Sequence, residues 1–227
     1  MISGTTRLVA LLGHPVSSSL SPRMQNAAFA AAGLDWAYVA CDVGHGDFGA
    51  AVRGLAAAGF AGANVTTPHK AAAANLAETE LRSVNTLVFD QGVIRGHSTD
   101  AAVLAGLTVE CPVVLGDGGV ATAFLEALPR ARQFARRGEW PPEVGDADLV
   151  VNATSERDEV LVELAPGQTL VDLPYPETAT ARAARAAGAT VVEGREVLVA
   201  QGAAAFELWT GVQAPVEAMR RVIGLSS

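Results

Sequence analysis

Lys70 is the only lysine in the chain, whereas 15 of the 16 basic residues are arginines. A GC-rich genome, which favours alanine and arginine codons, is one explanation of this bias. Arginine keeps its proton near neutral pH, but the surroundings of a lysine can lower its pKa enough for it to exchange one. The lone lysine therefore indicates proton chemistry, with chance survival as the alternative.

The residues around this lysine are polar and follow a strand-like segment. Asn64 to Lys70 places polar side chains at the end of a strand and the lysine in the first turn of the next helix. Ligand contacts in α/β folds gather at such strand ends. Asp100 begins a later helix, either as an acid that favours the helix dipole or as a partner that orients the lysine and holds its proton. A surface lysine with a threonine cap is the simpler interpretation of Lys70.

Two other segments could bind anions. Ser17 to Pro22 precedes a helix, with Ser21 as its expected cap and Pro22 in its first turn, which suits a carboxylate but also an ordinary capped helix. Gly116 to Gly119 follows a buried strand and resembles the phosphate loop of a dinucleotide-binding unit. Arg136 and Arg137 lie where an acid would favour NAD, so they indicate NADP or are only solvated surface charges.

Composition limits the class of protein. The 227 residues suffice for one large or two small domains, and half of them are hydrophobic. A net charge of −8 argues against a nucleic-acid partner. Cys41 and Cys111 are read as reduced thiols, and the four histidines lack metal-ligand spacing. No apolar run is long enough for a membrane span or a signal peptide, so we expect a soluble, cytoplasmic protein with no metal.

The segments that must position these residues are expected strands that alternate with alanine-rich helices. This alternation predicts an α/β fold. In the first half we expect strands at 7–12, 36–42, 61–66, 84–89 and 93–97, and helices at 21–32, 47–58 and 68–77. In the second half we expect strands at 113–115, 149–152, 168–172 and 190–192, and helices from the glycine loop to 128 and at 178–187, 200–210 and 216–223. Between Arg137 and Asp146 there is no room for a crossover helix, so the second sheet should be abbreviated.

In this order, the motifs resemble the shikimate dehydrogenase family along nearly the whole chain. The matching segments are Gly13 to Pro22, Asn64 to Lys70, Val84 to Thr86, Thr99 with Asp100, Val199 to Gln201, and Phe206 to Gly211. The resemblance implies a substrate domain of residues 1–105 with 203–227 and a shortened Rossmann-like dinucleotide-binding domain of residues 106–202. It also implies that the C-terminal helices pack back on the first domain.

The implied reaction is reversible reduction of a 3-dehydroshikimate-like cyclic keto acid by NADPH, giving shikimate or a quinate or aminoshikimate analogue. The resemblance makes Lys70 and Asp100 the catalytic pair. It assigns substrate binding to Ser19, Ser21, Thr66, Asn85, Tyr175 and Gln201. It assigns cofactor binding to Gly116, Gly118, Gly119, Arg136, Arg137, Asn152 and Thr154. The expected partner is a small cyclic hydroxy acid, and the chain is expected to be a monomer or homodimer.

Departures from the family pattern cluster in the dinucleotide half. Asp117 stands at a usually small position, and the charged run 155–158 replaces a glycine-methionine turn. Ser98 replaces the asparagine before Thr99, a mild change. A second hypothesis therefore stays open, in which the protein binds the cyclic acid without productive NADP binding and acts as a sensor or a different catalyst.

Overall fold

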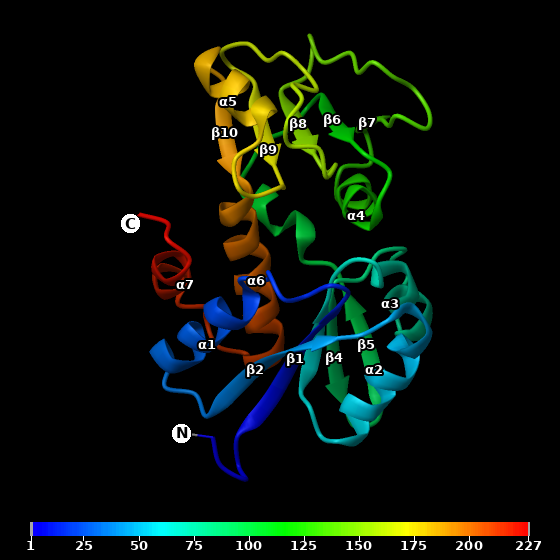
Figure 1. Cartoon of the computed structure of the whole chain (residues 1–227), viewed down its shortest axis with the longest axis vertical. Helices are drawn as coiled ribbons and strands as arrows, with labels where there is room; N and C mark the ends of the chain where they lie inside the picture. The colour runs from blue at the N-terminus through cyan, green and yellow to red at the C-terminus, as the bar shows by residue number, and fades with distance from the viewer. Residues whose placement is uncertain (1, 227) are drawn as a thin grey trace. The chain divides into compact units, whose positions relative to one another are not determined.

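The computed structural model describes residues 2–226, which form two compact units (Figure 1). The first consists of residues 2–99 and 198–226, and the second of residues 100–197. The family resemblance gave domain limits of 1–105 with 203–227 and 106–202, which stay a prediction. Both units are α/β layers, as the sequence predicted. No helix in residues 2–226 is long and apolar enough to cross a membrane.

The first unit is built on a mixed five-stranded sheet with the order β2-β1-β3-β4-β5. Its strands are β1 (Arg7–Gly13), β2 (Trp36–Asp42), β3 (Gly62–Val65), β4 (Thr86–Asp90) and β5 (Val93–His97). β1 pairs in parallel with β2 and β3, whereas β4 is antiparallel to β3 and β5. Gln91 and Gly92 have φ values of 48° and 85°, which suit a tight hairpin turn. The predicted hairpin is confirmed.

Helices cover both faces of this sheet because β1 is apolar on both sides. Val9 and Leu11 join a core with α1 (Ser21–Ala31), α6 (Gly194–Thr210) and α7 (Val216–Val222). Ala10 and Leu12 join the opposite core with α2 (Phe48–Ala57) and α3 (Lys70–Leu76). The C-terminal helices thus pack on α1, as the resemblance implied.

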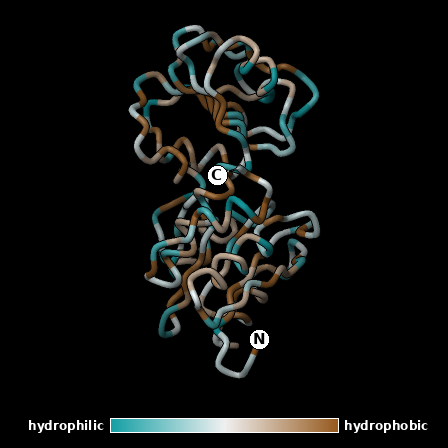
Figure 2. The backbone as a smooth tube through the Cα atoms, turned by 90° about the vertical axis from the view of Figure 1, so that its left-hand side faces the viewer, coloured by the Kyte–Doolittle hydropathy of each residue, from teal (hydrophilic) through white to brown (hydrophobic). Residues whose placement is uncertain are grey.

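The second unit has an all-parallel five-stranded sheet with the order β10-β9-β8-β6-β7. Its elements are β6 (Pro112–Leu115), α4 (Gly119–Ala127), β7 (Arg132–Phe134), β8 (Leu149–Asn152), β9 (Thr169–Asp172), α5 (Ala179–Ala186) and β10 (Thr190–Glu193). The central strands β6 and β8 are fully buried, and Figure 2 shows the hydrophobic colour concentrated there. Residues 135–148 contain no helix, which confirms that the crossover helix is missing.

Several element starts differ from the predictions. α3 begins at Lys70 rather than Pro68, because the bond from His69 N–H to the Thr66 carbonyl closes a turn first. α6 begins at Gly194 rather than Ala200. A Cβ on Gly194 would lie 2.3 Å from the Leu173 carbonyl oxygen, so the close approach of backbones at this start requires glycine. The structure also contains two short 3-10 helices, His45–Asp47 before α2 and Asp100–Leu104 before β6.

Candidate functional site

A buried polar network joins three strands of the first unit. The Tyr38 hydroxyl donates to Asn64 Oδ1 at 2.9 Å, and Asn64 Nδ2 donates to Thr86 Oγ1 at 3.0 Å. Thr86 Oγ1 donates to Asn85 Oδ1 at 3.1 Å, and Asn85 Nδ2 donates to Thr99 Oγ1 at 3.0 Å. All five side chains are at most 5% exposed. Mutual hydrogen bonds in a low-dielectric interior hold each group in one orientation.

The sheet register brings these residues together. Asn64 on β3 lies opposite Thr86 on β4, and Thr86 lies opposite His97 on β5, so the three side chains share one face. Tyr38 reaches the same face from β2. Burial raises the pKa of the Tyr38 hydroxyl far above its usual range, so it remains a hydrogen-bond donor at any physiological pH.

The two serines assigned to substrate binding lie beside this network. Ser21 is 7% exposed, and its backbone N–H donates to Ser19 Oγ at 3.2 Å. The Ser21 side chain hydrogen-bonds Tyr38. The expected helix cap at Ser21 is wrong: Ser21 is already the first residue of α1, and Leu20 holds the cap position without a side-chain bond. The hydroxyl is directed to the network instead of the helix amides.

Both residues expected to move protons are buried. Lys70 is 7% exposed and Asp100 is 8% exposed, and each begins a helical segment. The interpretation of Lys70 as a solvated surface lysine is therefore wrong. Its neighbour His69 anchors the start of α3, because His69 Nε2 lies 2.7 Å from the Val43 carbonyl and the ring stacks on Phe48.

Thr66 and Gln201 come from a strand end and a helix of the first unit. Thr66 is half-buried, and its N–H donates to the Leu12 carbonyl at 2.9 Å. A Cβ on Gly13 would lie 2.2 Å from Thr66 Cγ2, so this glycine allows the loop after β1 to pass Thr66 closely. Gln201 lies on α6, and its Nε2 donates to the Leu198 carbonyl at 3.1 Å.

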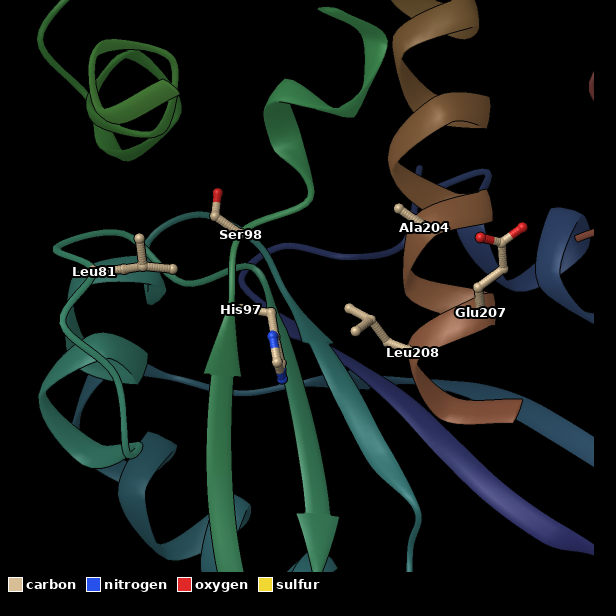
Figure 3. Close-up of a pocket in the computed structure, with 6 residues that line it drawn as sticks. All are labelled: Leu81, His97, Ser98, Ala204, Glu207 and Leu208. Carbon is tan, nitrogen blue, oxygen red and sulfur yellow. The ribbon is translucent and has the colours of Figure 1, made fainter. Parts of the chain in front are cut away.

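A cavity of about 580 Å³ lies in the first unit between the end of β5 and α6 (Figure 3). It is lined by Leu81, His97, Ser98, Ala204, Glu207 and Leu208. The Ser98 hydroxyl is buried and has no hydrogen-bond partner within residues 2–226. Burial lowers the pKa of His97, and the charge of Arg95 lowers it further. The sequence did not predict this cavity. Two of its lining residues, His97 and Ser98, directly precede Thr99 along the chain.

In the second unit, the glycine loop and both arginines line one cavity of about 430 Å³. Its lining comes from the ends of β6, β7 and β8 and from the loops that follow them. Gly116, Gly118, Arg136, Arg137 and Thr154 are thus brought together, and Gly119 begins α4 beside them. Gly116 has a φ of 118°, a value that favours glycine, and a Cβ on Gly118 would meet nothing within 4 Å.

This cavity contains charges of both signs. Arg136 forms an ion pair with Glu159, whereas Arg137 has no ion-pair partner within the described part of the chain. Asp117 and Glu156 add two carboxylates to the lining. The backbone N–H groups of residues 157–159 donate to Glu156, and these bonds lower the pKa of that carboxyl. These bonds favour the charged form of Glu156, so this carboxylate adds a negative charge near any bound phosphate.

Three predicted residues of the second unit lie outside this lining: Gly119, Asn152 and Tyr175. Asn152 is fully buried, and its Nδ2 donates to Asp172 Oδ1 at 2.8 Å. Its Oδ1 accepts from Thr154 Oγ1 at 2.7 Å, so Asn152 supports the loop that lines the cavity. Tyr175 is 36% exposed and lines a smaller cavity of about 190 Å³ in the same unit with Arg195.

Sequence reasoning also missed Tyr38, Trp140 and Glu159. Tyr38 lies within an apolar strand, and a buried tyrosine hydroxyl usually needs a partner, which was the available signal. Trp140 lines the second cavity, and Glu159 forms an ion pair with Arg136 of that lining. Both residues lie in segments without regular secondary structure. Glu159 gave no signal, because its partner Arg136 is distant in sequence.

Comparison with known proteins shows the family of the chain. Residues 11–87 match the shikimate dehydrogenase substrate binding domain, and residues 194–223 match the shikimate 5′-dehydrogenase C-terminal domain. A shikimate dehydrogenase (NADP(+)) of Moorella thermoacetica is 39% identical over 277 residues, covering 98% of this chain and 94% of that protein. The chain belongs to the shikimate dehydrogenase family.

Solved structures of the family share the fold. The shikimate dehydrogenase of Aquifex aeolicus is 28% identical with a TM-score of 0.88, over 99% of this chain and 100% of that one. The shikimate 5-dehydrogenase of Thermus thermophilus, solved with NADP(H) and shikimate, is 30% identical with a TM-score of 0.84, over 96% and 98%. The Moorella alignment spans 277 positions against 227 residues here, so at least 50 positions lack a counterpart in this shorter family member.

Proposed function

We propose that the chain is an NADP-dependent shikimate dehydrogenase, which reduces 3-dehydroshikimate reversibly to shikimate. The observation that carries the proposal is the burial of Lys70, the only lysine of the chain. Burying an ammonium group costs free energy unless partners compensate. A buried lysine therefore fits a role in catalysis better than the role of a surface charge that keeps a protein soluble. Full-length similarity to NADP-dependent shikimate dehydrogenases supports the same activity.

The second-unit cavity fits a dinucleotide. The space in front of Gly118 is open, so a pyrophosphate can approach the backbone at the start of α4. Gly116, Gly118 and Gly119 would hold that group, Arg136 and Arg137 the adenosine phosphate, and Thr154, braced by Asn152, the adjoining wall. NADPH supplies the hydride when it is bound.

The chain's own part in the reaction is proton transfer and orientation. Lys70 would donate a proton from Nζ to the ring oxygen during reduction and remove it during oxidation. Asp100 would orient the ammonium group and stabilise its charged form. Because the polar network already fixes Asn85 and Thr99, little reorganisation is needed when substrate binds.

We assign the remaining contacts by chemistry. Ser19 and Ser21 would bind the substrate carboxylate, and Thr66, Asn85 and Gln201 the ring hydroxyls, while Tyr175 would lie near the ring. Shikimate is the proposed substrate, with quinate and amino analogues as alternatives. We further propose the domain limits 1–105 with 203–227 and 106–202, a cytoplasmic location, and a monomer or homodimer.

One observation favours a second function. Asp117 and Glu156 place two carboxylates in the cavity proposed for NADP, and like charges weaken phosphate binding. A protein with this lining could bind the cyclic hydroxy acid alone and act as a sensor or a different catalyst.

Calorimetric titration of the purified full chain separates the two functions. Shikimate, NADPH and NADH are titrated separately, and then NADPH is titrated in the presence of shikimate. The dehydrogenase proposal predicts binding of shikimate and NADPH, with NADH weaker. If shikimate binds but neither NADPH nor NADH binds at millimolar concentration, only the second function remains.

A further inference from the structure

The cavity of the second unit has an aromatic side chain in its lining, Trp140, in the segment where the crossover helix is missing. Trp140 is half-buried and also packs against the hydrophobic core that contains Phe134 and Val150. The indole is therefore held by the core while it borders the cavity. This position is typical of a rigid stacking surface, since few rotamers remain available to a side chain packed in this way.

Arg136 forms a pair with this indole. The guanidinium carbon lies 5.7 Å from the Trp140 ring centroid, within the distance of a cation–π contact. Glu159 forms an ion pair with the same guanidinium. A short turn brings the two residues together, because Ala135 N–H donates to the Glu139 carbonyl at 3.1 Å and Gly138 N–H donates to the Ala135 carbonyl at 2.8 Å.

Arg136 and Arg137 consequently differ in what they offer a ligand. Glu159 offsets part of the charge of Arg136 in an exposed ion pair, and the planar guanidinium also offers a ligand a flat surface. Arg137 is exposed, lines the cavity and has no ion-pair partner in the part of the chain that the structure describes. It contributes the uncompensated positive charge.

We propose that Trp140 and Arg136 form a stacking wall for the adenine base of NADP, while Arg137 alone recognises the 2′-phosphate. The inference rests on the proposed function and refines it, since it divides the roles of the arginine pair and adds Trp140. A purine ring stacks favourably on both indole and guanidinium surfaces.

The test uses the adenosine half of the cofactor with the full chain. Calorimetry compares 2′,5′-ADP and 5′-AMP on the wild type and on Trp140→Leu, Trp140→Phe and Arg137→Ala. Arg130→Ala is the matched charge control, because Arg130 is exposed and does not line the cavity. Leucine keeps apolar contact with the core but removes the aromatic face, whereas phenylalanine keeps both.

Trp140→Leu should weaken both ligands about tenfold, and Trp140→Phe should retain affinity within about threefold, as expected when stacking is lost or kept. Arg137→Ala should weaken 2′,5′-ADP about 10- to 100-fold and leave 5′-AMP within about twofold, because only the phosphate contact is removed. Arg130→Ala should change neither.

Unchanged affinity of Trp140→Leu, or equal losses for both ligands in Arg137→Ala, would overturn this inference while the wild type still binds NADPH. If the wild type binds shikimate but neither NADPH nor 2′,5′-ADP, the proposed cofactor itself is wrong. Should Trp140→Leu fail to fold by circular dichroism, Arg136→Leu provides the second measurement. It should weaken both ligands alike, and a loss confined to 2′,5′-ADP would contradict the division of roles.

Discussion

The polar side chains near the strand ends differ between the two units in charge and in burial. In the first unit, Tyr38, Asn64, Asn85, Thr86 and Thr99 are neutral, buried and bonded to one another. In the second, the cavity lining includes exposed arginines and carboxylates. Hydrogen bonds between neutral groups fix positions, whereas exposed charges adjust to a ligand and respond to salt. The first arrangement suits stereospecific recognition of a small ring, and the second suits a charged nucleotide.

The second unit also has a buried network, but that network contains an acid. Asn152 bonds Asp172, and burial raises the pKa of the Asp172 carboxyl above its ordinary value despite the bonds from Asn152 and Thr178. We therefore expect the two units to respond differently to pH as well as to mutation.

The largest effect should come from Lys70. Replacing it by alanine should lower turnover about 10²- to 10⁴-fold, the usual size of a general acid–base contribution, with a much smaller change in KM. Lys70→Arg should also lose activity, because arginine keeps its proton. Steady-state rates measure this, with thermal unfolding as the control for folding. An unchanged rate would remove Lys70 from the mechanism.

The buried network should be the next most sensitive feature. Asn64→Ala removes the acceptor of the Tyr38 hydroxyl and a donor to Thr86, so it should lower the free energy of unfolding by about 1–3 kcal/mol. Urea unfolding measures the loss. A change below about 0.5 kcal/mol would mean that these hydrogen bonds are replaced by water.

Asp172 should make the stability of the second unit pH-dependent. Its pKa is raised from 3.8, chiefly by burial, so the folded state binds the proton more tightly than the unfolded state. The contribution of this group to stability is present below pH 3.8 and is lost as the pH rises through the raised value. Asp172→Asn should gain stability relative to the wild type over that window. A difference that does not vary with pH would contradict the assignment.

Ser98 should matter least. Its buried hydroxyl has no hydrogen-bond partner within residues 2–226, so Ser98→Ala should change the free energy of unfolding by less than about 0.5 kcal/mol, or raise it slightly. The same urea experiment measures this. A loss above about 1 kcal/mol would show that the hydroxyl is satisfied in solution, for example by water.

Local sequence signals predicted much of this structure. Gln91 and Gly92 marked the hairpin, the apolar run at Leu149–Asn152 marked β8, and the short span after Arg137 ruled out a helix. The three residues of β7 (Arg132–Phe134) are too few to show a period, so that strand was missed.

What the sequence did not predict depends on contacts between distant residues. The Ser21 hydroxyl hydrogen-bonds Tyr38 rather than capping α1, because the tertiary structure brings Tyr38 beside it. Trp140 and Glu159 acquire their significance only when Arg136 lies beside them. Lys70 could be identified because its residue type is unique in the chain, and its burial follows from the position of α3.

Hydride transfer to and from the ring is the central claim, and one rate measurement tests it most directly. The purified full chain is mixed with shikimate and NADP, and the appearance of NADPH absorbance is followed against a Lys70→Ala control. We predict sustained formation of NADPH by the wild type and a rate reduced at least about 100-fold in the variant. Shikimate binding with no NADPH formed from shikimate and NADP, and no NADPH consumed with 3-dehydroshikimate, would contradict the account.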